Sequence, residues 1–301
     1  MKIKEKFLKV YAEFLSGELK ILRKIKIVFD ASNGFAGQII KEAIGGNQLI
    51  QPIFINCRPD GKFPAHGPNS SAPGAADELI KEVVQKKADA GFIFDGDGDR
   101  VIIADEKGNL IHPDLVIRLY TKHYHPEKII IDRRIGWFVK EDLRTEEKVS
   151  IIKSKIGHLN VKRTMKENGA DFGAEGSGHY YFPVEGTYID SGAIMTMRMM
   201  TIISEDGSLS EWVSRQKPYF RSGEISFSVA SAERNIKSVA DYARKNGFEL
   251  DFEDGLYAEK EDFRFLLRPA ANEPLIRMNA EAKEENVLKK GVNLIQSLIS
   301  E

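Results

Sequence analysis

The hexapeptide Asp95-Gly-Asp97-Gly-Asp99-Arg100 is the densest group of chemically active side chains in the chain. Apolar runs at 91–94 and 101–104 flank it, so we expect a buried strand, a tight acidic loop and a second strand. Three carboxylates at alternate positions repel one another, and a hard divalent cation with oxygen ligands is the simplest way to hold them together. The glycines let the backbone turn so that the side chains converge. The sequence therefore predicts a metal site at Asp95, Asp97 and Asp99 that acts on a phosphate.

Three other interpretations of this hexapeptide stay open. A surface acidic turn needs only Asp and Gly, which are common turn residues. A calcium loop of the helix-loop-helix type has ligands at positions 1, 3, 5 and 12, where the three aspartates and Glu106 fall. Arg100 then occupies position 6, where glycine is needed. An aspartyl-nucleophile phosphatase also carries Asp-x-Asp after an apolar strand, although the third aspartate and Arg100 fit a metal loop better.

A second polar cluster is Glu175-Gly-Ser177-Gly-His179. Its glycines allow close approach of a polar ligand, and a carboxylate and a hydroxyl two residues apart can bind neighbouring sugar hydroxyls. His179 can transfer a proton near neutral pH or bind phosphate when charged. The alternative is a plain glycine turn with an incidental histidine.

Three weaker clusters also contain candidate ligand-binding residues. Ser154-Lys-Ile-Gly-His158 is either a functional loop or a helix-entry turn. Arg133-Arg134 follows an expected strand and so lies at its carboxyl end. Arg268-Pro-Ala-Ala-Asn272-Glu-Pro is typical of an anion cradle, because a guanidinium, turn amides and an Asn side chain can bind phosphate. Its alternative is an Arg-Pro turn between strands.

The elements that must position these residues alternate along the chain. An amphipathic helix is expected within 3–22, then strands at 25–29, 49–55 and 91–94 with helices between them, which favours a parallel sheet. In such sheets ligands bind beyond the carboxyl ends of the strands, where the acidic loop lies. A second alternating unit begins near Asn109 and a third near Ser222.

The composition is that of an ordinary globular chain. Its 301 residues are enough for two or three domains, and 30% of them are charged. A net charge of -1 indicates no general attraction to nucleic acid or to anionic membranes. The single Cys57 fits a reducing cytoplasm, and no apolar stretch is long enough to span a bilayer. We therefore expect a cytoplasmic protein that binds neither nucleic acid nor membrane.

The motifs, in their order and spacing, resemble the α-D-phosphohexomutase family, and within it the phosphomannomutase/phosphoglucomutase branch. The similarity runs from about residue 20 to the C-terminus. Besides the loops above, it includes three segments, 26–34, 63–69 and 207–211. The metal loop and the Glu-x-Ser-Gly-His loop are its specific motifs.

The resemblance implies an α/β fold of successive mixed α/β sandwich domains followed by a C-terminal α+β domain. An N-terminal helix at 1–22 precedes a metal-loop domain at 23–108, a sugar-loop domain at 109–221 and a phosphate-loop domain at 222–301. It implies interconversion of hexose 1-phosphate and 6-phosphate, of mannose or glucose, with Mg²⁺ as cofactor.

The resemblance also assigns roles to individual residues. The three aspartates would bind Mg²⁺, Arg100 would support a phosphoserine, and His158 and His179 would bind phosphate or assist proton transfer. The remaining candidates would contact the sugar phosphate: Arg133, Arg134, Glu175, Ser177, Arg268 and Asn272.

Two departures from the family pattern change the expectation. No Ser-His-Asn-Pro-type phosphoserine loop occurs in the sequence, and Ala270, Ala271 and Asn272 replace residues of the usual phosphate loop, two of which carry hydroxyls. We therefore expect an inactive catalytic body unless a phosphoserine domain is supplied, either by a separate chain or because this chain is a fragment of a longer one. The alternatives are a non-catalytic sugar-phosphate-binding or regulatory homologue and a metal-dependent sugar phosphatase.

Overall fold

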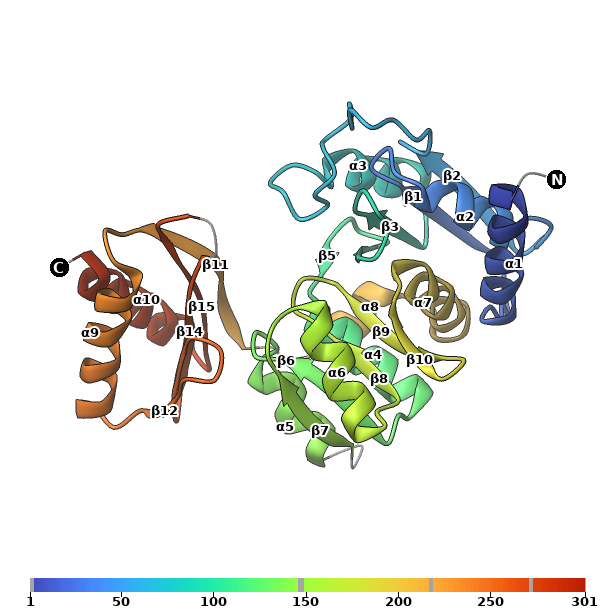
Figure 1. Ribbon diagram of the computed structural model, residues 1–301. Helices are drawn as coiled ribbons and strands as arrows, with labels where there is room; N and C mark the ends of the chain where they lie inside the picture. The colour runs from blue at the N-terminus through green and yellow to red at the C-terminus, as the bar shows by residue number, and fades with distance from the viewer. Residues whose placement is uncertain (1–2, 146–148, 217–218, 271–272, 301) are drawn as a thin grey trace.

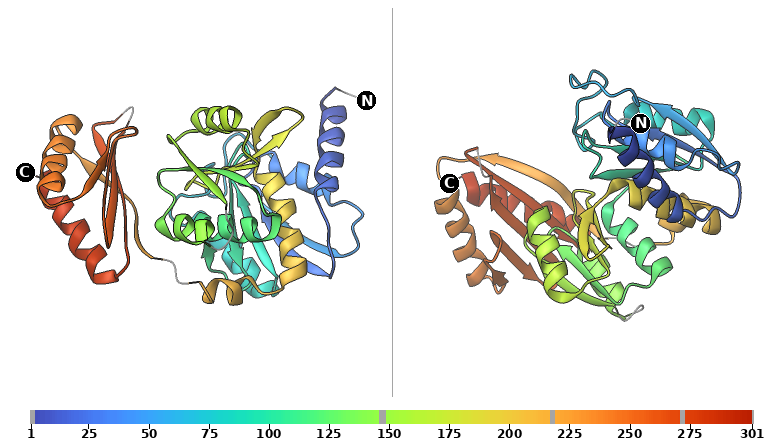
Figure 2. Two further views of the ribbon diagram at one scale, coloured as in Figure 1. Left: turned by 90° about the horizontal axis from the view of Figure 1, so that it is seen from below. Right: turned by 45° about the vertical axis from the view of Figure 1, so that its right-hand side comes forward.

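The computed structural model describes residues 3–145, 149–216, 219–270 and 273–300. Within these ranges the chain forms three successive five-stranded sheets, each with its own helices (Figure 1). The first two units lie against each other, and the C-terminal unit lies beside the second (Figures 1 and 2). No helix in the described part of the chain is both long and apolar enough to cross a bilayer.

The first unit carries the acidic loop. After helix α1 (Ile3–Gly17), its elements are β1 (Ile25–Asp30), α2 (Ala36–Ala43), β2 (Ile50–Ile55), α3 (Asp77–Lys86), β3 (Ala90–Phe94), β4 (Val101–Asp105) and β5 (Leu110–Ile111). The strand order is β2-β1-β3-β4-β5. Strands β2, β1 and β3 are parallel as expected, but β4 and β5 are antiparallel. A tight loop joins β3 to its neighbour β4, whereas a parallel pair would need a long crossover.

The second unit repeats this topology. Its elements are α4 (Pro113–Tyr124), β6 (Lys128–Asp132), α5 (Trp137–Thr145), β7 (Ser150–Ser154), α6 (His158–Asn168), β8 (Phe172–Ala174), β9 (Tyr180–Val184), β10 (Thr187–Asp190), α7 (Gly192–Asp206) and α8 (Leu209–Ser214). The strand order is β7-β6-β8-β9-β10, with the same parallel and antiparallel pairs in the same sequence. The acidic loop between β3 and β4 therefore corresponds to the Glu175–His179 loop between β8 and β9.

The first two units share one hydrophobic core, which fixes their loops relative to each other. Phe92 of the first sheet, Phe172 of the second and Met195 of α7 are fully buried in the same cluster. Helix α7 follows the second sheet in sequence but packs against β3 and β4 of the first. Helix α4 follows the first sheet, and its Tyr120 stacks on Phe172 of the second at 4.1 Å. Burying one such side chain contributes about 1.5–3 kcal/mol.

Local capping places α4 and α7. His112 precedes Pro113 at the first turn of α4, and its ring nitrogen accepts a hydrogen bond from the Asp114 backbone N–H at 3.2 Å. Ser191 caps α7 by accepting from the Ile194 N–H at 3.1 Å. These caps stabilise the starts of α4 and α7, the two helices that pack between the first and second units.

The C-terminal unit is an antiparallel sheet covered on one face by two helices (Figure 2). Its elements are β11 (Phe220–Ser228), α9 (Ala232–Lys245), β12 (Glu249–Asp251), β13 (Leu256–Lys260), β14 (Phe263–Pro269), β15 (Leu275–Ala282) and α10 (Glu285–Ser300). The strand order is β11-β15-β14-β13-β12. Alternate residues of β14 and β15 form a separate core with α9 and α10, and the residues between them face the second unit.

Buried charges connect the C-terminal unit to the second unit. Arg221 forms ion pairs with Asp114 of α4 and, at 2.9 Å, with Glu281 of β15. Arg264 pairs with the same Glu281 at 2.5 Å, and Glu281 also accepts from the Trp137 N–H at 2.9 Å. This network joins the C-terminal sheet to α4 and to the start of α5 in the second unit.

Candidate functional site

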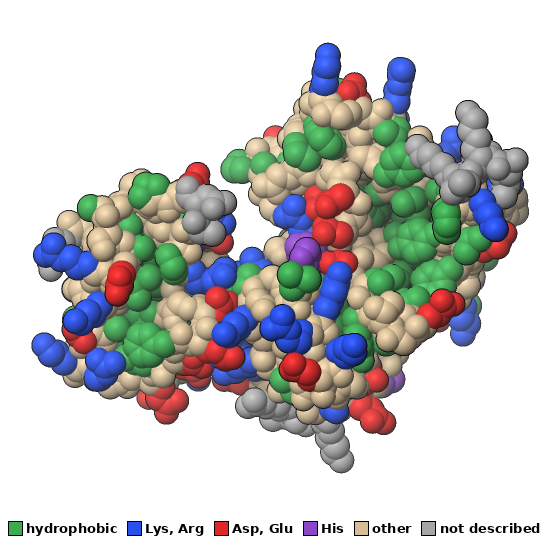
Figure 3. All heavy atoms as spheres, in the orientation of Figure 1, with side chains coloured by type: hydrophobic (Ala, Val, Ile, Leu, Met, Phe, Trp, Pro, Cys, Tyr) green, Lys and Arg blue, Asp and Glu red, His purple; other side chains and the backbone are tan. Residues whose placement is uncertain are grey.

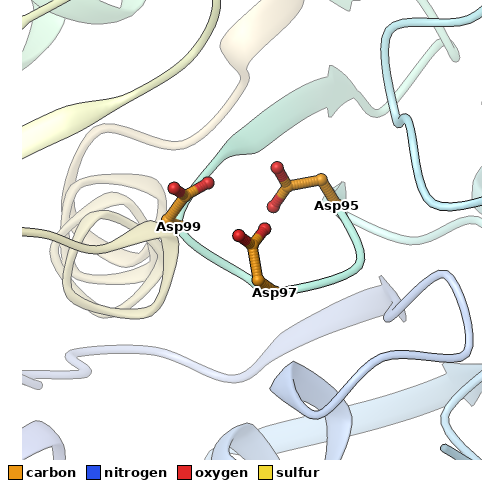
Figure 4. A group of neighbouring side chains, drawn as sticks. All are labelled: Asp95, Asp97 and Asp99. Atoms are coloured by element: carbon orange, nitrogen blue, oxygen red, sulfur yellow. The ribbon is translucent and has the colours of Figure 1, made fainter. Parts of the chain in front are cut away.

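The three aspartates of the acidic loop converge, as the sequence predicts. Figure 4 shows their carboxylates directed toward a common centre, and one oxygen from each lies within 4.8 Å of the other two. Asp95 is buried at the end of β3, Asp99 is half-buried and Asp97 is exposed. Among the described residues, the buried Oδ1 of Asp99 has no hydrogen-bond partner. An all-oxygen donor set with one unsatisfied buried oxygen fits a hard divalent cation.

Hydrogen bonds to the Asp95 carboxylate hold the backbone of the acidic loop. Asp95 Oδ1 accepts from the Gly98 and Arg100 N–H groups, both at 3.1 Å, and the Arg100 guanidinium pairs with Asp95 Oδ2. Burial raises the pKa of Asp95 to about 6 despite this guanidinium. Strand β4 begins at Val101, so no helix follows the loop and a helix-loop-helix calcium site is excluded.

The acidic loop and the Glu175–His179 loop are in direct contact. Arg100 and His179 form an antiparallel bridge, and the Val101 N–H donates to the Gly178 carbonyl at 3.1 Å. His179 Nε2 lies 3.3 Å from Asp99 Oδ2. In Figure 3 acidic side chains gather beside a histidine where the first two units meet. Two loops that are about 80 residues apart in sequence thus form one polar surface.

His179 is held between two carboxylates. Its Nδ1 lies 3.2 Å from Glu175 and 2.9 Å from the Ser177 hydroxyl, and its Nε2 faces Asp99. Burial alone would lower the pKa of His179, but the hydrogen bonds to Asp99 and Glu175 outweigh it and raise that pKa to about 9. The imidazole is therefore a cation at neutral pH in this arrangement.

Glu175 is buried and fully engaged inside its own loop. It accepts from the Gly157 N–H at 2.7 Å and the Tyr181 hydroxyl at 2.6 Å, with Arg134 at 3.4 Å. Burial opposes ionisation, but the bonds from His179, Tyr181 and Gly157 lower the pKa of Glu175 to about 2. In this state Glu175 shapes the loop, whereas Ser177 and Gly176 line the cavity.

A cavity of about 860 Å³ lies between the three units and next to both loops. Arg100 and Ser177 line it, together with strand residues of the C-terminal unit. A smaller cavity of about 370 Å³ lies beside the acidic loop and includes Asp95 and Asp97. Arg100 and Asn69 line both cavities, so the larger cavity lies next to the smaller one and to the acidic loop.

The two consecutive arginines after β6 point in different directions. Arg134 donates to Asp132 at 2.5 Å and to Ser177 at 3.3 Å, which ties it to the Glu175–His179 loop. Arg133 is 4% exposed and pairs with Asp251 at 2.6 Å and with Glu253, both in the C-terminal unit. Both line the larger cavity, but the main contacts of Arg133 join the units.

Two further predicted residues, His158 and Arg268, do not line either described cavity. His158 is half exposed and lies 3.8 Å from Asp190. Arg268 pairs with Asp254 at 3.2 Å and does not line either described cavity. Asn272 lies outside the described residues.

Several cavity residues were not predicted from the sequence. They come from the start of α4 and from the C-terminal sheet: His112, Arg221, Glu224, Arg264, Arg277 and Asn279. Alternating charged and apolar residues in β14 and β15 could have indicated a polar sheet face. The sequence held no signal that this sheet face contacts the second unit, because the contacting residues of that unit are more than 100 residues away in the chain.

Family models match both of the first two units. The model described as phosphoglucomutase/phosphomannomutase, alpha/beta/alpha domain II matches residues 5–108, and the corresponding domain III model matches residues 116–219. Together they match more than half of the chain. The chain belongs to the phosphoglucomutase/phosphomannomutase family. The repeated topology of the first two sheets is thus the topology of domains II and III.

Individual relatives extend the similarity across the C-terminal unit. A phosphomannomutase of Methanocaldococcus jannaschii is 32% identical over 302 aligned residues, which cover 99% of this chain and 66% of the relative. A phosphomannomutase of Salmonella typhimurium is 34% identical over 91% of this chain and 62% of its own length. A crystal structure of a family protein from Burkholderia thailandensis has a TM-score of 0.82 at 26% identity, covering 97% of this chain and 63% of that protein. The chain therefore spans less than two thirds of the length of these relatives.

Proposed function

We propose that this chain forms the metal- and sugar-binding body of a phosphohexomutase, which interconverts hexose 1-phosphate and hexose 6-phosphate. The observation that carries the proposal is the contact between the acidic loop and the Glu175–His179 loop through His179. A carboxylate cluster suited to a divalent cation and a glycine-rich polar loop suited to a sugar thereby border one cavity. Membership of the family supports the same activity.

Each residue then has a role that its surroundings support. Asp95, Asp97 and Asp99 would hold Mg²⁺, which would supply charge neutralisation at the transferring phosphoryl group. Arg100 orients Asp95 through the guanidinium and the backbone N–H. His179 holds a proton between Asp99 and Glu175 and so keeps the two loops together.

The sugar would lie against Ser177 and Arg134, which contact each other at 3.3 Å on the cavity side. Glu175 reaches sugar hydroxyls only if its present bonds to Gly157 and Tyr181 rearrange. We propose that it mainly positions this loop until substrate enters.

The reaction needs a serine that carries the phosphoryl group, and residues 1–301 contain no Ser-His-Asn-Pro-type loop. We propose that the described units act on a phosphoserine from a further domain, whether in the same protein or in a second chain. The phosphoryl group would pass from that serine oxygen to a sugar hydroxyl, and the sugar's other phosphate would return to the serine.

The test is conversion of glucose 1-phosphate or mannose 1-phosphate to the 6-phosphate, followed by ³¹P NMR with Mg²⁺. The chain is assayed alone and with a phosphorylated serine domain from a family member. We expect conversion with the domain present and loss of that conversion in Asp97→Asn. Absence of conversion with a domain that is active in its own parent enzyme would overturn the proposal.

A second candidate is a non-catalytic sugar-phosphate-binding homologue. Ala270 in the loop after β14 offers no hydroxyl, and the preceding Arg268 is held by Asp254. This candidate predicts hexose phosphate binding, seen by calorimetry, with no conversion under any condition of the first test. Absence of such binding would remove it.

A further inference from the structure

The acidic loop rests on the 63–69 segment, which follows β2 in the first unit. The Gly96 N–H donates to the Pro68 carbonyl at 2.9 Å. A Cβ added at Gly96 would lie 2.9 Å from both the Phe63 ring and the Pro68 side chain. Gly96 separates the first two aspartates of the loop, whose carboxylates point to the common centre (Figure 4). The 63–69 segment therefore forms a wall against which these carboxylates are held.

His66 attaches the middle of this segment to the end of β1. Its Nε2 lies 3.3 Å from both carboxylate oxygens of Asp30, the last residue of that strand. Asp30 is fully buried, and the His66 side chain is 11% exposed. Among the described residues, His66 Nδ1 is buried and has no hydrogen-bond partner. The contact with Asp30 is thus the polar contact that fixes the imidazole.

The Asp30 carboxylate joins three segments of the first unit. Besides His66, it accepts from the Ser32 N–H at 2.9 Å and from the Asn56 side-chain amide at 3.1 Å. Ser32 lies in the turn after β1, and Asn56 directly follows β2. Removing one donor from a buried carboxylate leaves part of its desolvation cost uncompensated. His66 is therefore the donor that ties the 63–69 segment to this junction.

The backbone of the 63–69 segment is held in a conformation that needs such support. Phe63 has a φ of +48°, in the left-handed region that bulky side chains seldom adopt. Residues in this region keep the conformation only where their surroundings impose it. The Phe63 N–H donates to the Asp60 carbonyl at 2.9 Å, and the Gly67 N–H donates to the Phe63 carbonyl at 3.2 Å. These bonds and the His66 contact together place the Phe63 ring against Gly96.

We propose that His66 is a positioning residue for the metal ion: its pair with Asp30 holds the 63–69 segment against Gly96 and so keeps the carboxylates of the acidic loop converged. This inference rests on the metal site of the proposed function. Asp30 is not one of the three converging carboxylates, so the pair acts through the loop and not on the ion. A loop that is already ordered avoids the cost of ordering it when the ion binds.

The test is the Mn²⁺ affinity of the full chain, measured as free Mn²⁺ by electron paramagnetic resonance. His66→Leu removes the donor to Asp30 and is expected to weaken Mn²⁺ binding by about 10-fold. His66→Gln can still donate to Asp30 and should keep most of the affinity. His123→Leu is the matched control, because His123 also lies 3.3 Å from a carboxylate, that of Glu205, but in the last turn of α4. This control should leave Mn²⁺ affinity unchanged.

A second variant tests the same wall without changing the histidine. Phe63→Ala removes the ring that contacts Gly96 and leaves the pair of His66 with Asp30 in place. It should also weaken Mn²⁺ binding, and it decides the matter if His66→Leu does not fold. Circular dichroism and urea unfolding establish that each variant is folded under the binding conditions, so that a lower affinity does not come from unfolded chain.

The outcomes separate this inference from the proposed function. Equal Mn²⁺ affinity of wild type and His66→Leu, or of wild type and Phe63→Ala if His66→Leu is unfolded, overturns the inference while the proposed function stands. An equal loss in His66→Leu and His66→Gln also overturns it, because the donor would then be irrelevant. Absence of Mn²⁺ binding by wild type removes the metal site and with it both claims. The expected losses, without sugar phosphate conversion when the serine domain is present, leave the inference standing and overturn the proposed function.

Discussion

Individual side chains of the acidic loop have different surroundings, and this decides which of them is the best probe of metal binding. Asp95 is buried and accepts hydrogen bonds from its own loop, and Asp99 faces His179. Asp97 is exposed. Substitution at Asp97 should therefore change metal binding with the least effect on the fold.

We expect Asp97→Asn to weaken Mn²⁺ or Mg²⁺ binding by at least about 10-fold, because even residues that only orient metal ligands cost 10-fold to 100-fold when changed. Electron paramagnetic resonance of Mn²⁺ measures the free ion directly. Asp241→Asn, an exposed carboxylate on α9, is the control and should leave affinity unchanged. Equal affinity of Asp97→Asn and wild type would argue against a metal at this loop.

The sequence predicted the residues of both loops, because glycine spacing and carboxylate spacing are local properties. It could not predict the different directions of Arg133 and Arg134. Both arginines lie in the turn after β6, where the alternation of a strand no longer fixes side-chain direction, and only the packed C-terminal unit decides which arginine meets Asp251. The hydrogen bonds that hold Glu175 inside its loop were not predictable either, because their donors, Tyr181 and Gly157, belong to other elements.

At the scale of elements, the acidic loop is held by neighbouring loops at the carboxyl ends of parallel strands. Gly34, in the turn after β1, lies so close to it that an added Cβ would be 2.3 Å from the Gly96 carbonyl oxygen. The Gly96 N–H in turn donates to the Pro68 carbonyl at 2.9 Å. The acidic loop is therefore packed between two other loops of its unit.

Gly34→Ala should displace the acidic loop and lower metal affinity by more than about 10-fold, at a cost in stability of about 1–3 kcal/mol from overpacking. The close neighbour is backbone, which cannot move aside as a flexible side chain can. Gly61→Ala is the matched control, since nothing lies within 4 Å of its added Cβ. Calorimetry of metal binding and urea unfolding measure both effects. Unchanged metal affinity in Gly34→Ala would show that the loop position is unimportant.

Element order and most strand positions followed from the sequence, because apolar strands and amphipathic helices alternate clearly in the first two units. The hairpin of β9 and β10 was not predicted. Its strands are short, and Pro183 and Gly186 interrupt the pattern. The repeated topology was suggested only loosely by the alternation, since strand order depends on pairing between distant segments.

At the scale of the whole molecule, the C-terminal unit depends on the buried network of Asp114, Arg221, Arg264 and Glu281. Burial alone would raise the pKa of Asp114, but the Arg221 guanidinium outweighs it and holds that pKa below its usual value. Arg264 and Arg221 likewise outweigh burial and lower the pKa of Glu281. No local sequence pattern could predict this network, because Arg221 and Asp114 are 107 residues apart.

Both carboxyls have a lower pKa in the folded state than when unfolded. Their contribution is therefore fully present above the unfolded pKa of about 4 and is lost as the pH falls below it. We expect the C-terminal unit to lose stability progressively as the pH falls from about 4 toward 2, measured as hydrogen exchange in β11 and β15. Constant protection over this range would contradict the assignment.

Arg221→Met should destabilise the contact between the second and C-terminal units by about 3–5 kcal/mol at pH 7, because it leaves buried carboxylates without this partner. It should also move the acid transition to higher pH. Arg244→Met, which removes an exposed pair with Asp241, should change neither quantity. Thermal unfolding at several pH values measures both.

The central claim is that the metal loop and the sugar loop form one site. The most direct test is the relaxation of the ³¹P nucleus of glucose 1-phosphate bound to the full chain with Mn²⁺ in place of Mg²⁺. We predict strong paramagnetic enhancement that disappears in Asp97→Asn and when excess Mg²⁺ displaces Mn²⁺. Binding of both ligands with unchanged phosphorus relaxation would contradict the account, as would failure of the sugar phosphate to bind.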